Sequence, residues 1–297
     1  MISKLKVKRS LVGYLFMLPA LVIVCGLIIY PLFQNLINSF FEWNWIKSGM
    51  DTKTFIGFAN YKRVFMDKLF WNSFWNTLVF SGIALGIEFT LGLVVALLLN
   101  QVGKGSLLFR IVIMFPLMIS DIVAALTWKM LLDPSLGPIN NFLSTVGLPT
   151  PNWLGNPKLV LPVLSIVDVW WQTGNIALVL LSGLQSMSIE PIEMAKIDGA
   201  NRNQIFRFLT WPHLLPFVRT AVLFRIMDLM KVFALPWGIT RGGPGRASEV
   251  SQLYIYKQGI GSYLDMGYAA SLAVTFSIFV IVILTVVNSF FKGVEEA

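Results

Sequence analysis

Charged residues are scarce in this chain of 297 residues. They account for 13% of the sequence and apolar residues for 56%, whereas about a quarter of a typical soluble domain is charged. The chain has one cysteine, Cys25, and one histidine, His213, which excludes an internal disulfide and disfavours a histidine-based metal site. The apolar content and a mean hydropathy of +0.72 exclude a disordered chain, a collagen and a coiled coil. A membrane protein with several spans remains.

Long apolar runs are what the sequence has in abundance. A membrane-spanning helix needs roughly 20 mostly apolar residues, and six runs reach this length, which predicts an all-α polytopic membrane protein. No loop is longer than about 40 residues, which is too short for a domain with its own core. We therefore expect residues 1–297 to form one transmembrane domain. The six predicted spans are Leu11–Phe33, Phe74–Leu99, Leu107–Trp128, Leu159–Met187, Leu214–Trp237 and Met266–Phe291.

The basic residues predict how the spans are oriented. A dense cluster, Lys4, Lys6, Lys8 and Arg9, precedes the first span, and such clusters usually stay on the cytoplasmic side. With six spans, the N-terminus and the C-terminus are then both cytoplasmic. The net charge of +8 is explained by cytoplasmic loops beside anionic lipid, so it does not indicate binding to nucleic acid.

The connection Ser188–His213, between the fourth and fifth predicted spans, has helical signals of its own. Glu190 and Glu193 favour the N-terminus of a helix, and Pro191 suits its first turn. A short helix–turn–helix of this kind is typical of a docking element, and the alternative is an interfacial helix lying among lipid headgroups. Residues at spacings of three and four predict a small, flat docking face made of Ile192, Ala195 and Gly199.

Ionisable residues inside the predicted spans are candidates for function, because an unpaired charge in hydrocarbon costs several kcal/mol. Arg225, Asp228 and Lys231 follow one another at a spacing of three, which puts Asp228 within reach of either cation on one helix. We favour an internally paired structural cluster, and the alternative is a polar stripe along a translocation path. The other ionisable residues in or near the spans are Glu88, Asp121, Lys129 and Asp168.

Polar residues of the fourth predicted span are candidates for contact with a solute. Three uncharged polar side chains there lie beside two tryptophans. Sugars are bound by amide and hydroxyl groups together with stacking on aromatic rings. The alternative is that the same groups bond neighbouring helices to each other. With the carboxylate noted above, the residues expected along the solute path are Trp170, Gln172, Thr173, Asn175 and Asp228.

The sequence contains no catalytic or metal-binding pattern. The phosphate-binding motif G-x-x-x-x-G-K-[ST] is absent, so we expect any ATP hydrolysis to reside in another polypeptide. A membrane enzyme is also disfavoured, because the lone His213 has no matching serine and aspartate arrangement and no predicted loop holds carboxylates at a catalytic spacing. We expect neither a catalytic residue nor a cofactor in this chain.

Three blocks of the sequence resemble one family of transport proteins. The stretch Glu193-Met194-Ala195-Lys196-Ile197-Asp198-Gly199-Ala200, followed by Leu209-Thr210-Trp211-Pro212, resembles the EAA signature of the permease subunits of binding-protein-dependent ABC importers. Two further blocks are similar to the carbohydrate-type branch of that family, the relatives of the maltose and glycerol-phosphate permeases. They are Asp168-Val169-Trp170 with Leu181–Ser186, and Gly242-Gly243-Pro244 with Tyr254-Ile255-Tyr256. The chain departs from the signature at Met194, where an alanine is usual.

The resemblance implies a transport subunit that works with other chains. It implies that Ser188–His213 is a cytoplasmic coupling segment docked on a separate ATPase. The implied partners are two ATPase subunits that bind ATP and Mg²⁺, a second, different permease of the same family, and an external solute-binding protein. It also implies import of a sugar, polyol or sugar phosphate across the plasma (inner) membrane of a bacterium or archaeon. The implied coupling residues are Glu193, Met194, Ala195, Asp198, Gly199 and Ala200.

One alternative function stays open at this point. A secondary transporter driven by an ion gradient would also explain acidic residues inside the spans, and it would need no ATPase partner. It predicts an inverted internal repeat, which is not visible in the sequence.

Overall fold

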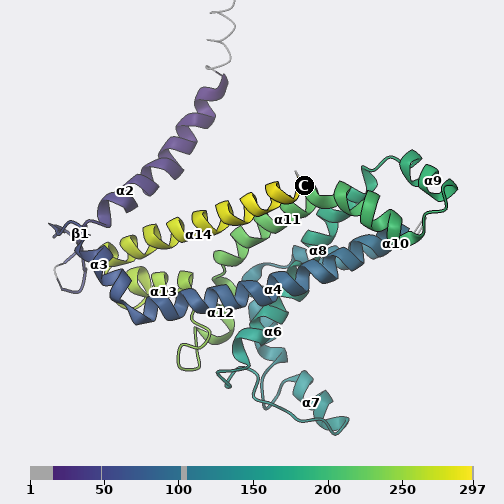
Figure 1. Cartoon of the computed structure of the whole chain (residues 1–297). Coiled ribbons are helices and arrows are strands. Elements are labelled where there is room, and N and C mark those ends of the chain that lie inside the picture. The colour runs from purple at the N-terminus through teal and green to yellow at the C-terminus, as the bar shows by residue number, and fades with distance from the viewer. Residues whose placement is uncertain (1–15, 48, 102–105, 296–297) are drawn as a thin grey trace, which may run out of the picture. The chain divides into compact units, whose positions relative to one another are not determined.

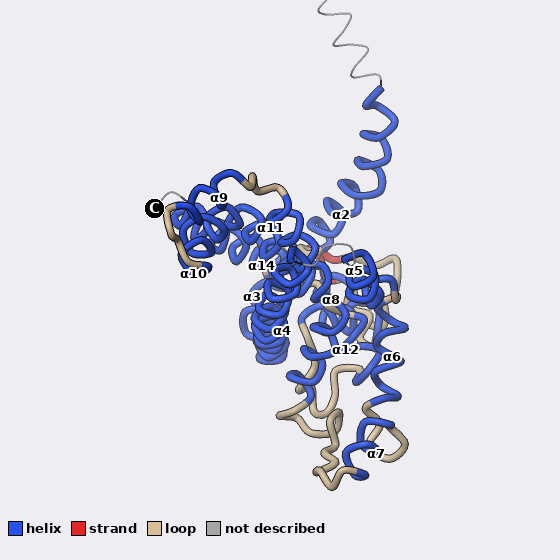
Figure 2. Tube along the Cα trace, turned by 90° about the vertical axis from the view of Figure 1, so that its right-hand side faces the viewer, coloured by secondary structure: helices blue, strands red, loops and turns tan. Residues whose placement is uncertain are grey.

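The computed structural model describes residues 16–47, 49–101 and 106–295. Within them the chain is mostly helical, and Figure 2 shows the helices in blue, the loops in tan and one short pair of strands in red. The basic cluster from Lys4 to Arg9 and the first residues of the predicted span that begins at Leu11 lie outside the described residues. The orientation derived from that cluster stays a prediction.

The elements follow one another along the chain as labelled in Figure 1. Four short segments, marked η, have other helical geometries: η2 is a 3₁₀ helix, and η1, η3 and η4 are π-helical. The order is η1 (Cys25–Ile29), α2 (Tyr30–Asn38), β1 (Phe41–Glu42), β2 (Thr54–Phe55), α3 (Ala59–Met66), α4 (Lys68–Gln101), α5 (Ser106–Met114), η2 (Phe115–Met118), α6 (Asp121–Leu131), α7 (Pro138–Thr145), α8 (Val160–Gln185), α9 (Glu190–Ile197), α10 (Arg202–Ile205), η3 (Phe206–Thr210), α11 (Trp211–Met230), α12 (Ala234–Thr240), α13 (Ser251–Tyr256), η4 (Lys257–Gly261) and α14 (Met266–Glu295).

The chain divides into two compact units, and each is described by itself. Unit 1 contains Met1–Asp67 and Ile255–Ser277, and unit 2 contains Lys68–Tyr254 and Ile278–Ala297. The last helix, α14, contributes residues to both units. The expected single transmembrane domain stays a prediction.

Unit 1 has a polar network around its short strand pair. β1 and β2 are antiparallel, with Phe41 opposite Phe55. The buried side chain of Asn60 on α3 donates to the backbone oxygens of Ser39 and Phe41, each at 3.0 Å. These bonds satisfy backbone groups that a two-residue strand leaves unpaired, so α3 fixes the position of β1.

A second set of contacts in unit 1 joins α3 to the start of α14. Arg63 donates from Nη1 to Oδ2 of Asp265 at 2.8 Å, and its guanidinium lies 3.7 Å from the centre of the buried Tyr268 ring. The Asp265 carboxylate also accepts the backbone N–H of Tyr268 at 3.3 Å, as a residue before a helix commonly does. Arg63 therefore packs against the residues that begin α14.

Four helices in the described part of the chain are long and apolar enough to cross a membrane. They agree with four of the six predicted spans and extend one of those, Phe74–Leu99, at both ends. The first of them has no buried residue in its most apolar 18-residue stretch, so its side chains face outward all round. The four are Phe16–Asn38, Lys68–Gln101, Val160–Gln185 and Met266–Gly293.

The predicted span Leu107–Trp128 is not one straight helix. The segments Leu107–Met118 and Asp121–Leu131 are bent by 92° to each other. Pro116 lies at the start of the short η2 and has no N–H for a helical bond. Ser120 is then extended (φ −60°, ψ 141°), and a new helix begins at Asp121. A hydropathy pattern does not register this break because both arms are equally apolar.

The predicted span Leu214–Trp237 is also interrupted. α11 ends at Met230, and α12 begins at Ala234 after a short turn. Three charged residues on α11, Arg219, Arg225 and Asp228, reduce its apolar character. The count of six spans stays a prediction, and the described residues establish a helical protein with several apolar helices.

Unit 2 is built around α4, α8 and α11, which pack against one another. Its core contains fully buried apolar side chains such as Phe80 and Leu164. At Gly183 on α8, an added Cβ would lie 2.7 Å from the ring of Phe217 on α11. Glycine is therefore needed at this close approach of the two helices.

The segment between α6 and α8 is rich in turns and carries α7. The carboxylate of Asp133 accepts the backbone N–H groups of Leu136 at 2.8 Å and Ser135 at 2.9 Å. These bonds hold the pKa of Asp133 below its usual range, because they favour the charged form. Further along, Trp153 donates from Nε1 to the buried Asn140 at 2.7 Å, which anchors the segment while its tip stays exposed.

Candidate functional site

Three charged side chains from three helices of unit 2 meet in a buried ion triad. Arg225 on α11 donates from Nε to Oε2 of Glu88 on α4 at 2.6 Å, and from Nη2 to Oε1 at 2.9 Å. Nη2 also donates to Oδ2 of Asp168 on α8. The side chains of Arg225, Glu88 and Asp168 are 5%, 0% and 4% exposed. Since a buried charge without a partner is strongly destabilising, these contacts hold α4, α8 and α11 in register.

The ion triad differs from the cluster that the sequence predicts. We expected Arg225, Asp228 and Lys231 to pair along one helix, whereas Arg225 pairs with carboxylates on two other helices. A spacing rule finds neighbours on the same helix, and partners on other helices escape it. The sequence identifies Glu88, Asp168 and Arg225 as ionisable residues in apolar runs, but it does not predict that the two carboxylates share Arg225.

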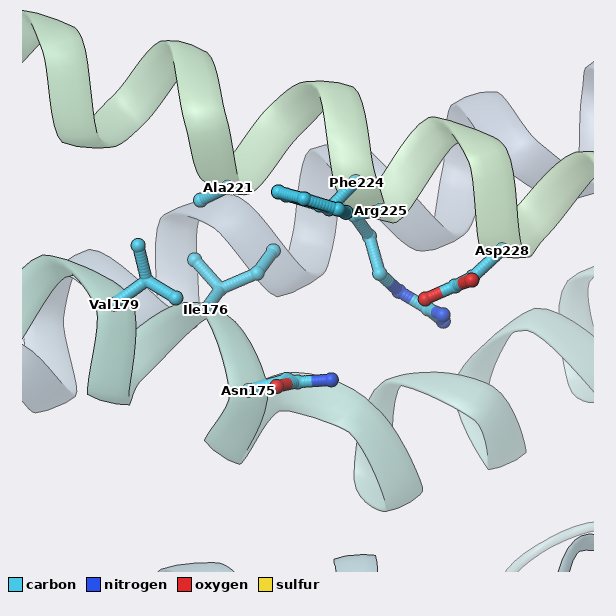
Figure 3. Close-up of a pocket in the computed structure, with 7 residues that line it drawn as sticks. All are labelled: Asn175, Ile176, Val179, Ala221, Phe224, Arg225 and Asp228. Atoms are coloured by element: carbon cyan, nitrogen blue, oxygen red, sulfur yellow. The ribbon is translucent and has the colours of Figure 1, made fainter. Parts of the chain in front are cut away.

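A cavity of about 320 Å³ lies between α8 and α11 on one side of the ion triad. We call it the Asn175 cavity. Figure 3 shows that its residues come from two facing helices, with the guanidinium of Arg225 and the carboxylate of Asp228 pointing toward one another. Its walls combine apolar side chains with a few polar groups, as ligand cavities usually do. The lining residues are Asn175, Ile176, Val179, Ala221, Phe224, Arg225 and Asp228.

A second cavity, of about 260 Å³, lies toward α6 and α12, and we call it the Asp121 cavity. Arg225 and Asp228 line this cavity as well as the first. Three carboxylates and two cations contribute to its wall, along with the ring of Trp171. The lining residues are Asp121, Asp168, Trp171, Gln172, Arg225, Asp228, Leu229, Lys231, Val232, Phe233, Ala234 and Leu235.

Three of the five residues expected along a solute path line these cavities. Gln172 lines the Asp121 cavity, Asn175 lines the Asn175 cavity, and Asp228 lines both. Asn175 donates from its amide to Oε1 of Gln172 at 3.3 Å, so a pair of amides bridges one cavity to the next along α8. Their contact with a solute stays a prediction.

The other two expected residues line neither of these cavities. The ring of Trp170 packs edge to face on Trp128, with centroids 5.5 Å apart. The hydroxyl of Thr173 donates to the backbone oxygen of Val169 at 2.6 Å, within its own helix. Instead the neighbouring Trp171 reaches the Asp121 cavity. The sequence alone does not distinguish the two adjacent tryptophans, because the position of α6 determines which face of α8 packs against it and which face lines the cavity.

The expected helix–turn–helix is present at the opposite end of α8 from α7. α9 begins at Glu190, with Pro191 and Glu193 in its first turn, as the sequence predicts. It ends with the N–H of Gly199 bonded to Lys196 at 3.1 Å and that of Ala200 bonded to Ala195 at 2.9 Å. This pair of bonds is a Schellman motif, which needs a left-handed residue, and Gly199 supplies it with φ +82°.

The outward face of α9 differs from the one expected. Ile192 and Ala195 are half-buried, whereas Met194 is 63% exposed and Ile197 is 86% exposed. Ile192 and Ala195 therefore turn toward the rest of the chain, whereas Gly199 and the two large apolar side chains are exposed. Among the other residues implied by the resemblance, Glu193, Asp198 and Gly199 are exposed and Ala200 is half-buried.

A shallow recess of about 290 Å³ follows α9, lined by Asp198, Gly199, Ala200, Gln204 and Phe208. Its far wall is fixed by a capping box at α10, in which the backbone N–H of Gln204 and the carboxamide oxygen of Asn201 bond at 2.9 Å and the return bond is 2.8 Å. Phe208 is 68% exposed beside it. An added Cβ on Gly199 would meet nothing within 4 Å, so the space above this glycine is open.

The base of the segment is joined to α8. Nε2 of His213 lies 3.1 Å from the hydroxyl of Ser186 and 3.2 Å from the backbone oxygen of Gly183. His213 follows η3 by three residues, and Ser186 follows the last residue of α8. The two ends of the segment are therefore held side by side, and its position follows that of α8 and α11.

The comparisons with known proteins address the whole chain. The family described as "Binding-protein-dependent transport system inner membrane component" matches residues 88–296, which include both cavities and the α9 segment. The chain belongs to this family. This match confirms the resemblance that the signature residues carry. It also confirms the prediction of a membrane protein.

Relatives of this permease resemble it over most of its length. It is 34% identical to the trehalose/maltose transport system permease protein MalF of Thermococcus litoralis over 287 residues, 95% of this chain and 93% of the relative. It is 30% identical to the sulfoquinovosyl glycerol transport system permease protein SmoG of Agrobacterium fabrum, over 89% of this chain and 85% of the relative. These relatives are transport permeases, in agreement with the absence of catalytic patterns.

Solved structures share the fold of this permease. A chain of a bacterial alginate ABC transporter, in complex with an alginate pentasaccharide-bound periplasmic protein, superposes with a TM-score of 0.84. The superposition covers 98% of each chain at 22% sequence identity. A chain of the MetNI methionine ABC transporter has a TM-score of 0.55 over 77% of this permease. The fold is therefore that of an ABC transporter permease.

Proposed function

We propose that the chain is the transmembrane permease subunit of an ATP-driven importer, coupled to a separate ATPase through Ser188–His213. The observation that carries the proposal is the α9 segment. It places the family signature, Glu193 to Ala200, on an exposed helix and turn whose ends are joined to α8 and α11. Those two helices enclose the Asn175 cavity. A displacement of the segment by a partner therefore moves the cavity walls, because α8 and α11 move as rigid helices.

The exposed groups of the segment suit a protein partner. Met194, Ile197 and Phe208 expose large apolar surface, and Glu193 and Asp198 flank it with charge. Such a mixture of an apolar centre and a charged rim is typical of protein interfaces. The recess above Gly199 accepts a partner backbone or side chain at close range. Met194, which replaces the usual alanine, then requires a matching hollow in the partner.

The working complex contains the chains that the family resemblance implies. Two ATPase subunits bind ATP and Mg²⁺ and supply the phosphate-binding loop that this sequence lacks. A second, different permease of the same family completes the transmembrane path. An external solute-binding protein delivers the solute, which agrees with the periplasmic protein named in the alginate transporter complex. The termini lie in the cytoplasm and the α7 segment on the outer face of a bacterial or archaeal plasma membrane.

The proposed solute is a sugar or a related polyhydroxy compound. Asn175, Gln172 and Asp228 offer amide and carboxylate groups to hydroxyls, while Trp171 and Phe224 offer aromatic faces. Arg225 is already bonded to two carboxylates, which leaves Lys231 as the cation for a phosphate. A neutral sugar therefore fits these cavities better than a sugar phosphate, and sugar transport agrees with the names of the relatives.

The experiment that tests the coupling is purification of the tagged chain from its native membrane in mild detergent, followed by mass spectrometry. We expect a Walker-motif ATPase and a second permease to co-purify. Met194→Asp and Ile197→Asp should each remove the ATPase, because a buried charge opposes an apolar interface. Phe142→Asp on α7, where the side chain is 67% exposed, is the matched control and should retain it.

The same experiment separates this proposal from a secondary transporter. A chain that purifies without an ATPase and transports solute in vesicles under an ion gradient would overturn the coupling role. The comparisons give that alternative no support, since the matched relatives with named functions are permeases of transport systems of the ABC type.

A further inference from the structure

The two cavities meet at Arg225 and Asp228. Along α8, Gln172 lines the Asp121 cavity and Asn175 the Asn175 cavity, so the cavities follow one another along the helix. Both are lined by Arg225 and Asp228 of α11. The bond from Arg225 to Asp168 therefore crosses from α11 to α8 at the level where one cavity gives way to the other.

Asp228 differs from the two carboxylates of the ion triad. It is exposed to the cavities, and its carboxylate makes no hydrogen bond or ion pair among the residues that the structure describes. It lies three residues from Arg225, a spacing at which side chains on a helix reach each other. Figure 3 shows its carboxylate pointing toward the guanidinium of Arg225. A second acceptor for the same cation is thus already in place.

We propose that Arg225 is a barrier between the two cavities that exchanges Asp168 for Asp228 when α8 and α11 separate. This inference rests on the proposed transport function. In the closed arrangement the Arg225–Asp168 bond blocks passage along α8. When the helices part, Asp168 leaves with α8, and Asp228, which moves with α11, takes its place.

The exchange explains why Asp228 is needed beside the three charges of the ion triad. Removing one partner of a buried ion pair is strongly destabilising, so a bond across a moving interface would resist opening if nothing replaced it. Glu88 holds Arg225 through two bonds and does not itself cross the α8–α11 interface. A second carboxylate on α11 keeps the cation paired in both arrangements, which makes the two arrangements close in free energy.

Cysteine labelling of the intact complex tests the exchange. In a Cys25→Ser background, Val179→Cys reports on the Asn175 cavity, Val232→Cys on the Asp121 cavity, and Phe142→Cys marks the outer face. A membrane-impermeant maleimide is added to sealed, right-side-out membrane vesicles that hold the complex, with and without ATP and vanadate enclosed inside them. In the chain without further substitution, we expect Val232→Cys to label from outside at rest and Val179→Cys to label only after trapping.

Two substitutions should change this pattern in opposite directions. Asp168→Asn removes the charge that pairs with Arg225 across the barrier, so labelling of Val179→Cys at rest should rise by about fivefold or more, the scale of a coupling of about 1 kcal/mol. Asp168→Glu should restore the original rate. Asp228→Asn removes the exchange partner, so labelling of Val179→Cys after trapping should fall by a similar factor.

The outcomes separate this inference from the proposed function. One outcome is that trapping changes labelling in the protein that carries only the reporter cysteine, and that Asp168→Asn and Asp228→Asn leave this pattern unchanged. The proposed barrier is then wrong and the transport function stands. If trapping with ATP changes no labelling at all, the proposed function fails first. If Asp168→Asn does not assemble, Asp228→Asn decides, because a purely structural ion triad predicts no effect at that position.

Discussion

Arg225 joins three helices of unit 2 through one side chain. It bonds Glu88 and Asp168 at a position where all three side chains are shielded from solvent. Buried ion pairs give little net stability compared with apolar packing, but the loss of one member leaves the others uncompensated. At the scale of single residues, the ion triad therefore acts as a unit.

Arg225→Met tests this unit directly. We expect it to lower the stability of the purified complex by about 3–5 kcal/mol, because Glu88 and Asp168 stay buried without a cation. The triple variant Glu88→Gln, Asp168→Asn and Arg225→Met should recover most of that loss. Thermal unfolding followed by tryptophan fluorescence measures both. Losses that simply add from one variant to the next would contradict the interpretation.

Gly199 is the second residue whose role can be separated from its neighbours. Gly199→Asp forces an L-residue into the left-handed region at a cost of about 1–2 kcal/mol and adds a charge at the recess. We expect normal membrane levels but solute-dependent ATP hydrolysis reduced by about tenfold or more.

Gly147→Asp is the matched control for this substitution. Gly147 has φ +73° and open space at its Cβ position, and it lies beyond α7. The same backbone strain there should leave ATP hydrolysis coupled to solute. Equal uncoupling by both substitutions would show that strain alone, and not the docking face, is responsible.

At the scale of elements, the α9 segment moves with α8 and α11 only if its base is closed. His213 provides that closure through Ser186 and Gly183. His213→Ala should cost about 1 kcal/mol locally, so amide hydrogens of α9 and α10 should exchange roughly fivefold faster. Hydrogen exchange with mass spectrometry measures this, and His213→Gln should preserve most of the protection. Unchanged exchange in the alanine variant would rule out a closing role for the histidine.

The sequence predicts a helix well where a single local signal, such as apolar length or a helix-ending glycine, determines it. Apolar length alone located α4, α8 and α14, and the acidic first turn and Gly199 located α9 and its end. The break after Pro116 was missed, because proline is tolerated in membrane helices when neighbours satisfy the backbone. α12 was merged with α11 for a similar reason: the turn between them, from Lys231 to Phe233, is mostly apolar.

The candidate site was predicted in part. Gln172, Asn175 and Asp228 line cavities, whereas Trp170 and Thr173 do not. Which face of α8 turns inward depends on the helices beside it, and no spacing in the sequence records that. The pairing of Arg225 with Glu88 joins residues 137 positions apart. Such a pair can be suspected from two opposite charges in apolar runs, but its geometry follows only from packing.

At the scale of the whole molecule, the first helix has a solvent exposure that only a membrane or a partner chain can explain. Cys25 lies in this helix and is exposed within the chain. We expect it to resist a water-soluble maleimide in native membranes, since lipid or a partner helix covers it and the reagent does not enter the hydrocarbon layer. It should react fully in sodium dodecyl sulfate, whereas Phe142→Cys in a Cys25→Ser background should react in both conditions. Rapid labelling of Cys25 in intact membranes would contradict the assignment of Phe16–Asn38 as a span.

The length of α4 has a consequence for how the protein meets the bilayer. Its 34 residues make a rod about 51 Å long at 1.5 Å per residue, whereas the hydrocarbon layer is about 30 Å thick. The surplus falls at its first turns, where polar side chains, Lys68 and Asn72 among them, alternate with Trp71 and Trp75, a composition suited to the headgroup region. The surface of a thicker or thinner bilayer can therefore lie at different positions along the first turns of α4 without exposing apolar side chains to water. The protein should thus tolerate membranes of different thickness.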